Sequence, residues 1–228
     1  MKQNKYAPGT NEPLSETEIG LSGTPDPRCP CFIMVDVSGS MAGKPIAEAN
    51  AGLQILKTNL TEDLLACSRV EIALATFNHV AILVAPFCSP ENFAPPTLVV
   101  SGGTRLGTAV IWGLGQLDAW MAELRAAGAS YYRPWFIVIT DAESSDRIEE
   151  AARLVKQAES EKRISFFSIG VLGANMDTLG KLSLRSPRHL EGLKFAELFE
   201  WFSVNLSAVA TSQPGEQVAL TQPTWTTV

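Results

Sequence analysis

The chain has 228 residues, of which 46% are hydrophobic and 18% charged, which is enough for one sizeable core and allows one or two domains. Its formal net charge is −6 and no run of Lys and Arg occurs, so the composition argues against nucleic acid as a partner. No apolar stretch approaches the roughly 20 residues of a membrane span, and the start does not resemble a signal peptide. We therefore expect a cytoplasmic protein that does not contact a membrane.

The cysteines and histidines give little support to a zinc site. The four cysteines include no C-x-x-C pair, and the two histidines are His79 and His189. We expect reduced thiols and histidines that lie at the surface rather than bind a metal.

Both ends of the chain differ in composition from its middle. Residues 1–28 contain four prolines and three glycines, which predicts an extended or partly ordered arm. Residues 211–228 are rich in Ser, Thr, Gln and Pro, which predicts a flexible C-terminal tail, with docking of Trp225 on the domain left open. The folded domain is expected over residues 29–210.

The first informative stretch of the domain joins an apolar run to three oxygen-bearing side chains. Residues 32–35 are apolar and lead directly into Asp36, and two hydroxyls follow at alternate positions, Ser38 and Ser40. The run predicts a strand over about 31–37 that is buried on both faces, with Asp36 at the carboxyl edge of a parallel sheet, where such sheets bind ligands. One carboxylate and two hydroxyls suit a hard cation such as Mg2+. The alternative is that these side chains only cap the next helix and close a tight turn.

Hydrophobic periodicity divides the rest of the domain into alternating helices and strands. The predicted elements are a helix over 44–63, a hairpin of strands over 70–77 and 80–84, an irregular Pro-rich segment over 85–100, a helix from about 104 to 124, a strand over 135–140, a helix over 146–162, a strand over 164–171, and helices over 176–183 and 195–208. This alternation predicts a three-layer α/β/α fold with a mostly parallel central sheet and one antiparallel edge strand.

Two later stretches add oxygen donors at the same predicted edge of the sheet. In the first, Gly102 and Gly103 let the backbone turn sharply and come close to a ligand, and Thr104 follows them. The Thr104 hydroxyl can face a cation or cap the next helix. In the second, Asp141 ends the strand over 135–140 in the same way that Asp36 ends the first strand.

In order and chemistry, these three loops resemble the von Willebrand factor type A domain. Members of that family form a metal-ion-dependent adhesion site from a D-x-S-x-S loop, a distant Thr and a later Asp, on a Rossmann-like fold. The resemblance covers about residues 30–210. The segment from Pro30 to Ile46 and the pattern Asn50-x-Gly52-Leu53-x-x-Leu56 are similar to the bacterial intracellular branch typified by the tellurium-resistance TerY and YegL proteins. One departure is Ala142, where many members carry Gly.

The resemblance implies a metal site made of five side chains. Ser38, Ser40 and Thr104 would bind the ion directly or through water, and so would Asp36 and Asp141. Mg2+ is the expected ion, with Mn2+ or Ca2+ possible. Neutral hydroxyls and only two carboxylates leave part of the cation's charge uncompensated, so the remaining position favours an Asp or Glu carboxylate from a protein partner.

The surroundings of the ion and the nature of the partner follow from the same resemblance. Met41, Arg105 and Glu143 flank the expected ion and either form a rim that contacts the partner or are merely exposed. Resemblance to the TerY branch implies a kinase or phosphatase as partner, in a bacterial stress or tellurium-resistance system.

Two other functions remain open on the sequence. The chain could be a scaffold in which the ion only orders the loops, or a Mg2+-dependent hydrolase. The hydrolase is disfavoured because the G-x-S-x-G pattern is absent and no second Asp lies close to Asp36, as a phosphatase of that type needs. We therefore expect a non-catalytic protein-binding module.

Overall fold

The computed structural model describes residues 26–142, 144–171 and 173–226. The predicted N-terminal arm, apart from its last three residues, and Glu143 lie outside these ranges. The strands of the described part are β1 (Cys29–Asp36), β2 (Val70–Phe77), β3 (Ala81–Cys88), β4 (Trp135–Thr140), β5 (Ser165–Gly170) and β6 (Arg188–His189).

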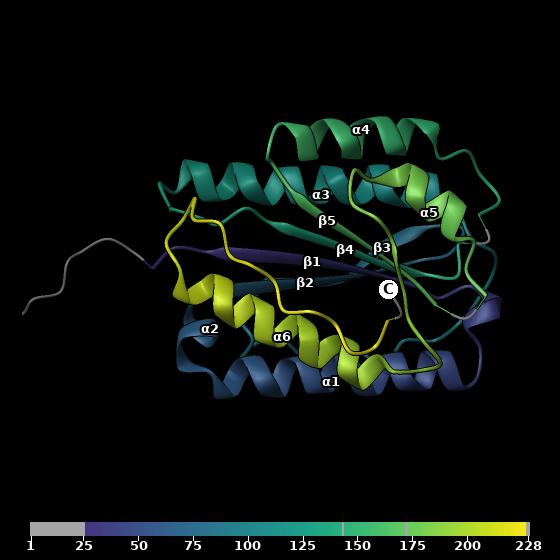
Figure 1. Ribbon diagram of the computed structural model, residues 1–228, viewed down its shortest axis with the longest axis horizontal. Coiled ribbons are helices and arrows are strands. Elements are labelled where there is room, and N and C mark those ends of the chain that lie inside the picture. Colours follow the sequence, from purple (N-terminus) through teal and green to yellow (C-terminus); the bar gives the residue numbers. More distant parts are fainter. Residues whose placement is uncertain (1–25, 143, 172, 227–228) are drawn as a thin grey trace, which may run out of the picture.

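These strands form one six-stranded sheet in the order β3-β2-β1-β4-β5-β6. β3 runs antiparallel to β2, and every other neighbouring pair is parallel. Helices cover both faces of the sheet, which gives three layers (Figure 1). The predicted three-layer fold with one antiparallel edge strand is confirmed.

The helices are α1 (Lys44–Glu62), α2 (Leu64–Arg69), α3 (Leu106–Ala126), α4 (Glu149–Ser160), α5 (Met176–Leu182) and α6 (Phe195–Thr211). α1, α2 and α6 lie on one face of the sheet, and α3, α4 and α5 lie on the other (Figure 1). α2 was not predicted from the sequence, and it begins because the Asp63 carboxylate accepts the backbone N–H groups of Leu65 and Ala66.

Two further differences from the prediction concern short or edge strands. β3 continues to Cys88, past the predicted end at residue 84, although it contains Pro86. An edge strand has one side without a neighbouring strand, so a proline there need not cost a ladder hydrogen bond. β6 was not predicted either, because two residues are too few to show a periodic pattern.

The sheet separates two hydrophobic cores, and β1 contributes to both. Every residue of β1 is buried, as expected for a central strand covered on both faces. Ile33 and Val35 belong to the core under α1 and α6, whereas Phe32 and Met34 belong to the core under α3 and α4. The end of β1, where Asp36 lies, is thereby fixed by packing from both sides.

The Asn50-x-Gly52 pattern has a packing role in this structure. A Cβ atom at Gly52 would clash with the ring of Phe199, so the missing side chain lets α1 and α6 approach closely. The Asn50 side chain accepts the N–H of Leu98 at 2.8 Å and donates to its carbonyl at 3.1 Å. Asn50 thus holds the segment that leads into the Gly102-Gly103 loop.

The segment after α6 is packed on the domain, which corrects the prediction of a flexible tail over residues 211–228 as far as residue 226. The Asn205 side chain in α6 accepts the Thr221 N–H at 2.8 Å and donates to its hydroxyl at 2.9 Å. Trp225 is fully buried with its ring 5.9 Å from that of Trp201. Composition predicted no fixed structure here because one buried Trp and a few polar contacts leave no periodic signal.

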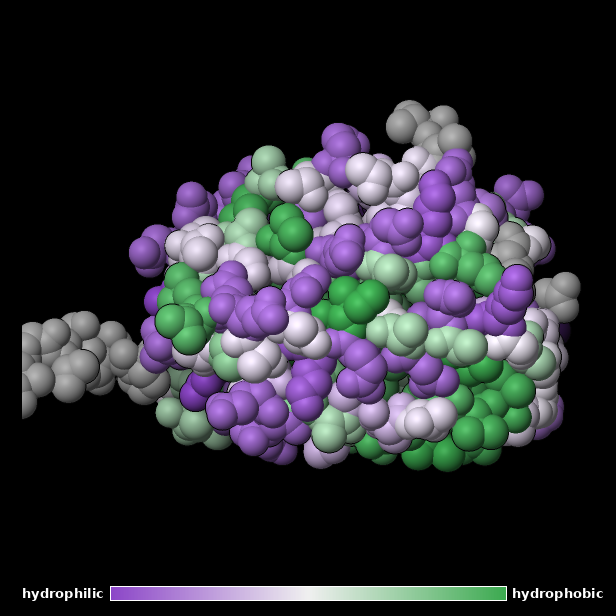
Figure 2. Space-filling model, turned by 90° about the horizontal axis from the view of Figure 1, so that it is seen from below, coloured by the Kyte–Doolittle hydropathy of each residue, from purple (hydrophilic) through white to green (hydrophobic). Residues whose placement is uncertain are grey.

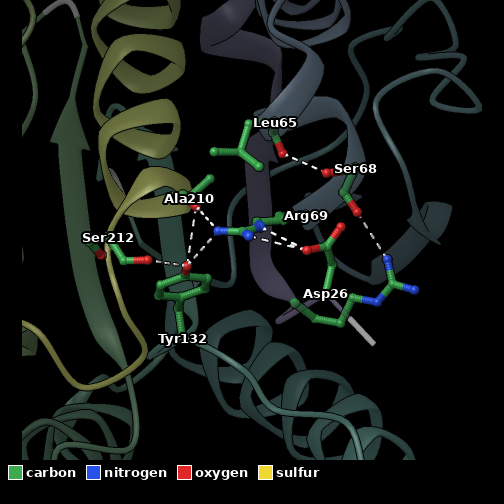
Figure 3. Close-up of polar contacts among 8 residues, drawn as sticks. Asp26, Leu65, Ser68, Arg69, Tyr132, Ala210 and Ser212 are labelled. Atoms are coloured by element: carbon green, nitrogen blue, oxygen red, sulfur yellow. Dashed lines mark hydrogen bonds and ion pairs between the residues drawn. The ribbon is translucent and has the colours of Figure 1, made fainter. Parts of the chain in front are cut away.

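The start of the described chain meets the end of α6 at the edge of the sheet opposite Asp36. Arg69 donates to the Ala210 carbonyl at 2.7 Å and forms an ion pair of 3.1 Å with Asp26 (Figure 3). The Tyr132 hydroxyl donates to the Ser212 carbonyl at 2.7 Å, where α6 has just ended (Figure 3). These contacts satisfy carbonyls that the end of a helix leaves without intrahelical partners.

The face formed by α1 and α6 mixes hydrophilic and hydrophobic side chains, and the largest hydrophobic group lies toward the lower right of the view (Figure 2). This pattern is usual for amphipathic helices that pack one stripe against a sheet. Within the part of the chain that the structure describes, no helix combines the length and the apolar character needed to cross a membrane.

The docked position of Trp225 makes a testable prediction about stability. Trp225→Ala should lower the free energy of unfolding by about 3 kcal/mol, because it empties a fully buried site. Val204→Ala is the matched control, since Val204 lies in α6 with 53% of its surface exposed and should change stability by less than about 0.5 kcal/mol. Urea unfolding measures both, and equal midpoints for the two variants would show that the segment is not docked in solution.

Candidate metal site

Asp36 ends β1 at the carboxyl edge of the sheet, and its side chain is fully buried. One carboxylate oxygen accepts the Ser38 backbone N–H at 2.8 Å, and the other accepts the Thr140 hydroxyl at 2.6 Å. Thr140 is the last residue of the neighbouring strand β4. Asp36 therefore links the first loop to the end of the adjacent strand.

The two serines of the first loop lie together. Ser38 and Ser40 have their hydroxyl oxygens 3.0 Å apart, with Ser38 buried and Ser40 exposed. A single 3-10 turn over Gly39–Met41 brings about this approach, because the chain reverses before α1 begins. Two hydroxyl oxygens at this distance can both face one cation, which would replace the hydrogen bond between them.

The second loop is held against the first by backbone hydrogen bonds. The Gly39 N–H donates to the Gly102 carbonyl at 3.0 Å, and the Ser101 N–H donates to the Val37 carbonyl at 2.7 Å. Gly102 has a φ of +72°, a left-handed conformation that favours glycine. Thr104 follows this turn and is buried to 4% exposure.

The third loop is joined to the second through Thr104. The Thr104 carbonyl accepts the Ser145 N–H at 2.8 Å and the Ser145 hydroxyl at 2.7 Å. Asp141, at the end of β4, is 4% exposed, and its charge lies near enough to Asp36 to contribute to the pKa of that residue. Hydrogen bonds thus bring together the three loops that carry the five predicted ligands.

The electrostatics at Asp36 favour a bound cation. Burial raises the pKa of Asp36 above its ordinary value, hydrogen bonds from Thr140 and Ser38 lower it, and the nearby charge of Asp141 raises it further. The net rise means that the protein does not fully compensate the buried negative charge. A divalent cation among these oxygens would supply the missing charge, so the donor set fits Mg2+ in both atom type and electrostatics.

Ala142 has an unusual backbone conformation directly after Asp141. Its φ is +58° and its side chain is buried. A left-handed conformation costs a non-glycine residue on the order of 1 kcal/mol, and such strain often lies at functional sites. Ala142 thus replaces the Gly that many family members carry, and its backbone still adopts the left-handed conformation that glycine adopts easily.

Asp146 supports the third loop, a role that was not predicted from the sequence. Its carboxylate accepts the backbone N–H groups of Gly107 and Thr108 at 3.1 and 2.8 Å, together with the hydroxyls of Thr108 and Ser144 at 2.6 Å each. Asp146 thereby caps α3 from a distant loop. In the sequence, Asp146 is only an acidic residue near the start of a predicted helix. That pattern predicts a cap for the helix that follows it, α4, and not for α3.

The predicted rim residues differ in their positions. Met41 is fully buried in the core under α1 and α6, which corrects its assignment to a partner-contact rim. The 3-10 turn points its side chain inward, a direction that a sequence pattern does not give. Arg105 is exposed beside Thr104, and Glu143 lies outside the described residues.

His79 is exposed in the turn after β2, as predicted for a histidine at the surface, and its ring also contacts the second loop. Its Nε2 atom accepts the N–H of Gly103 at 3.0 Å, so the imidazole lies against the second loop. Across the part of the chain that the structure covers, no group of three or more His, Cys, Asp or Glu side chains lies together. A metal bound at this edge would therefore depend on the hydroxyls of the first two loops.

Residues 32–196 match the family model of the von Willebrand factor type A domain. This match includes all five candidate ligands. A comparison with curated proteins gave no match.

Several solved structures share the fold at low sequence identity. A von Willebrand factor type A protein from Catenulispora acidiphila has 16% identity and a TM-score of 0.57, covering 80% of this chain and 43% of its own. The ArnB paralog VWA2 from Sulfolobus acidocaldarius has 14% identity and a TM-score of 0.53, covering 77% and 45%. The pilus adhesin SpaC from Lactobacillus rhamnosus GG, in an open conformation, has 10% identity and a TM-score of 0.61, covering 82% and 31%. The chain thus spans less than half of each of these structures, and the likeness shows the fold alone.

Asp146 makes a prediction about pH. Partial burial raises the pKa of Asp146, but hydrogen bonds from Ser144 and Thr108 outweigh this effect and hold the pKa below its ordinary value. A carboxylate with a lowered pKa stabilises the fold at pH values above about 3.9, the ordinary pKa of Asp, and loses this effect as the pH falls through the lower folded pKa. Asp146→Ala should therefore lower the free energy of unfolding by about 1 kcal/mol at pH 7, because a helix cap is lost, and by less at pH 3. The melting temperature at the two pH values measures this difference.

The control for this experiment is an acidic residue of the surface. Asp118→Ala removes a carboxylate whose side chain is 59% exposed, and it should leave the melting temperature nearly unchanged at pH 7. A loss of stability with Asp146→Ala that was equal at both pH values would contradict a role for the ionised carboxylate.

Proposed function

Because the chain belongs to the von Willebrand factor type A domain family, whose members are commonly protein-interaction modules, we propose that it is a non-catalytic, metal-dependent protein-binding module. One observation carries the proposal: three loops with five oxygen-bearing side chains are joined by hydrogen bonds at one edge of the sheet. That edge is where open α/β sheets bind their ligands.

The proposed ion is Mg2+, held directly or through water by the five candidate ligands, with Mn2+ or Ca2+ as substitutes. Ser38, Ser40 and Thr104 offer neutral oxygens, and Asp36 and Asp141 offer the two negative charges. Mg2+ prefers oxygen ligands and octahedral coordination and usually retains water, which suits a site with few protein charges. This assignment makes the loop set a metal-ion-dependent adhesion site.

The proposed partner is a protein that completes the coordination of the ion with an Asp or Glu carboxylate. A carboxylate brings a charge that hydroxyls and water lack, and its bond to the ion is strengthened by that charge. Ser40 is exposed while Ser38 is buried, so the site opens to solvent on the side where a partner can reach it.

The cellular system is proposed from sequence resemblance alone. Similarity of the segment from Pro30 to Ile46 to the TerY and YegL branch supports a bacterial protein of the cytoplasm. The partner would then be a kinase or phosphatase of a stress or tellurium-resistance system. Genes next to this one are the direct test, because such systems are encoded together.

A structural scaffold is the second candidate, and the hydrogen bonds argue against it. The Gly39 N–H to Gly102 carbonyl bond and the Ser145 contacts to Thr104 already tie the loops together. An ion is therefore not needed to order them. A hydrolase is less well supported, because the two serine hydroxyls bond to each other and the His79 Nε2 atom accepts a backbone N–H.

Metal binding is expected to be weak and measurable as thermal stabilisation. With a Kd on the order of 1 mM, 10 mM Mg2+ should stabilise the protein by about 1.4 kcal/mol, or about 4 °C in melting temperature. Asp36→Ala and Ser38→Ala should abolish the shift. Asp118→Ala, an exposed carboxylate outside the site, should retain it. An equal shift in all four proteins would show that the ions bind elsewhere.

The module and the scaffold predict different outcomes in a chelator titration followed by two measurements. For a binding module, EDTA should abolish partner affinity, and Asp36→Ala should abolish it as well. For a scaffold, EDTA should lower the melting temperature while partner affinity is unchanged. Partner binding that persists both in EDTA and with Asp36→Ala would contradict the proposed function.

A further inference from the structure

We propose that His79, supported by Asn78, is a positioning residue that fixes Thr104 for metal binding. This inference rests on the proposed function, since it assigns a role within the same site. Neither residue belongs to the predicted ligand set, and both lie in the turn between β2 and β3.

The turn lies at the same edge of the sheet as the metal ligands. Phe77, the last residue of β2, is in register with Asp36 at the end of β1. The Phe77 carbonyl also accepts the Val37 N–H at 2.9 Å, directly after Asp36. The two residues that follow Phe77 are thereby carried to the side of the second loop.

Asn78 holds both ends of the second loop. Its backbone carbonyl accepts the Arg105 N–H at 2.9 Å, and its side-chain amide donates to the Ser101 hydroxyl at 2.9 Å. The side-chain oxygen of Asn78 accepts the Val80 N–H at 3.0 Å, which closes the turn on itself. Asn78 therefore sets the distance between the turn and the loop.

His79 holds the middle of the loop by two kinds of contact. Nε2 accepts the Gly103 N–H at 3.0 Å, so this nitrogen carries no proton and the Nδ1 atom does. The ring also lies directly over the two glycines. A Cβ atom at Gly102 would come within 2.8 Å of the imidazole, and one at Gly103 within 2.9 Å. Two residues without side chains therefore make the space that the ring occupies.

Together these contacts fix Thr104 on each side. The N–H groups of its two chain neighbours, Gly103 and Arg105, donate to His79 and Asn78. Its own carbonyl accepts two hydrogen bonds from Ser145. The peptide group after Thr104 is thus anchored at both its carbonyl and its N–H, and His79 anchors the peptide group between Gly102 and Gly103, one residue before Thr104. We infer that these anchors set the direction of the Thr104 Cα–Cβ bond before any ion arrives. Outer partners of this kind typically change metal affinity 10- to 100-fold when removed.

A role in general stability does not account for His79. Its side chain is exposed, so it adds little to either hydrophobic core. Its hydrogen bond and its packing are both directed at the loop that carries Thr104. Loss of the imidazole should therefore affect metal affinity more than it affects folding.

The test is a series of substitutions at His79 followed by Mn2+ binding, measured from the paramagnetic resonance signal of the free ion. His79→Ala removes both contacts and should weaken Mn2+ affinity about 10-fold. His79→Gln offers a carbonyl acceptor near the position of Nε2 and should restore most of the affinity. His79→Phe keeps a ring over the glycines but has no acceptor, so its Mn2+ affinity should lie between those of His79→Ala and His79→Gln.

Two further measurements separate positioning from folding. Val80→Ala, at an exposed residue of the same turn, is the matched control and should bind Mn2+ as the wild-type protein does. The melting temperature without metal should be nearly the same for every variant. Amide exchange of Gly103, measured by nuclear magnetic resonance without metal, should be faster in His79→Ala and close to wild type in His79→Gln.

The outcomes distinguish this proposal from the proposed function. If the wild-type protein binds Mn2+ and His79→Ala binds it equally well, His79 does not position the site, and the proposed function is unaffected. Unchanged exchange at Gly103 in His79→Ala would also overturn the positioning role. If the wild-type protein and Asp36→Ala both fail to bind Mn2+, the metal site itself is wrong, and the positioning proposal falls with it.

Discussion

The geometry of the site depends on the buried carboxylate of Asp36 at the end of the central strand. A buried charge is costly unless hydrogen bonds or an opposite charge compensate it. Asp36 accepts one hydrogen bond from the first loop, through Ser38, and one from the end of β4, through Thr140. The same two bonds that reduce the cost of the charge also fix how two neighbouring strands end. Compensation stays incomplete, because burial and the charge of Asp141 both raise the pKa of Asp36.

The shape of the site and the balance of its charge depend on different interactions. Backbone hydrogen bonds give the loops their shape: Gly39 binds the second loop through Gly102, and Thr104 binds the third through Ser145. None of these bonds needs an ion. A cation would therefore add mainly charge to a framework that already exists, and with few carboxylates to neutralise it, the bound cation would still attract an external anion. A preformed framework with unsatisfied charge suits reversible recognition of a partner better than a purely structural role.

The sequence predicted those parts of the fold and site whose signals are local. β2 and β4 have the predicted bounds, and β1 lies close to its predicted range. β1 and β4 could be predicted because a strand buried on both faces reads as an apolar run, and β2 because apolar residues alternate with small or polar ones. The donors of the first loop stand within five residues and could be recognised together. His79 could not be recognised, since its role arises only when the hairpin turn lies over the two glycines. Met41 and the segment after α6 were misjudged for a related reason, because the direction of a side chain and the docking of a segment depend on tertiary contacts.

The two edges of the sheet serve different purposes, and this division bears on how the site can vary. At the edge opposite Asp36, Arg69 and Tyr132 bind carbonyls at the end of α6, and Arg69 also pairs with Asp26 at the start of the described chain (Figure 3). At the Asp36 edge, most donors lie on loops outside the two hydrophobic cores. Changes to Ser40 or His79, which are exposed, can therefore alter binding without removing core contacts. Asp36 and Thr140 are exceptions because they end strands and are buried. Substitution of either residue should therefore destabilise the fold as well as change the site.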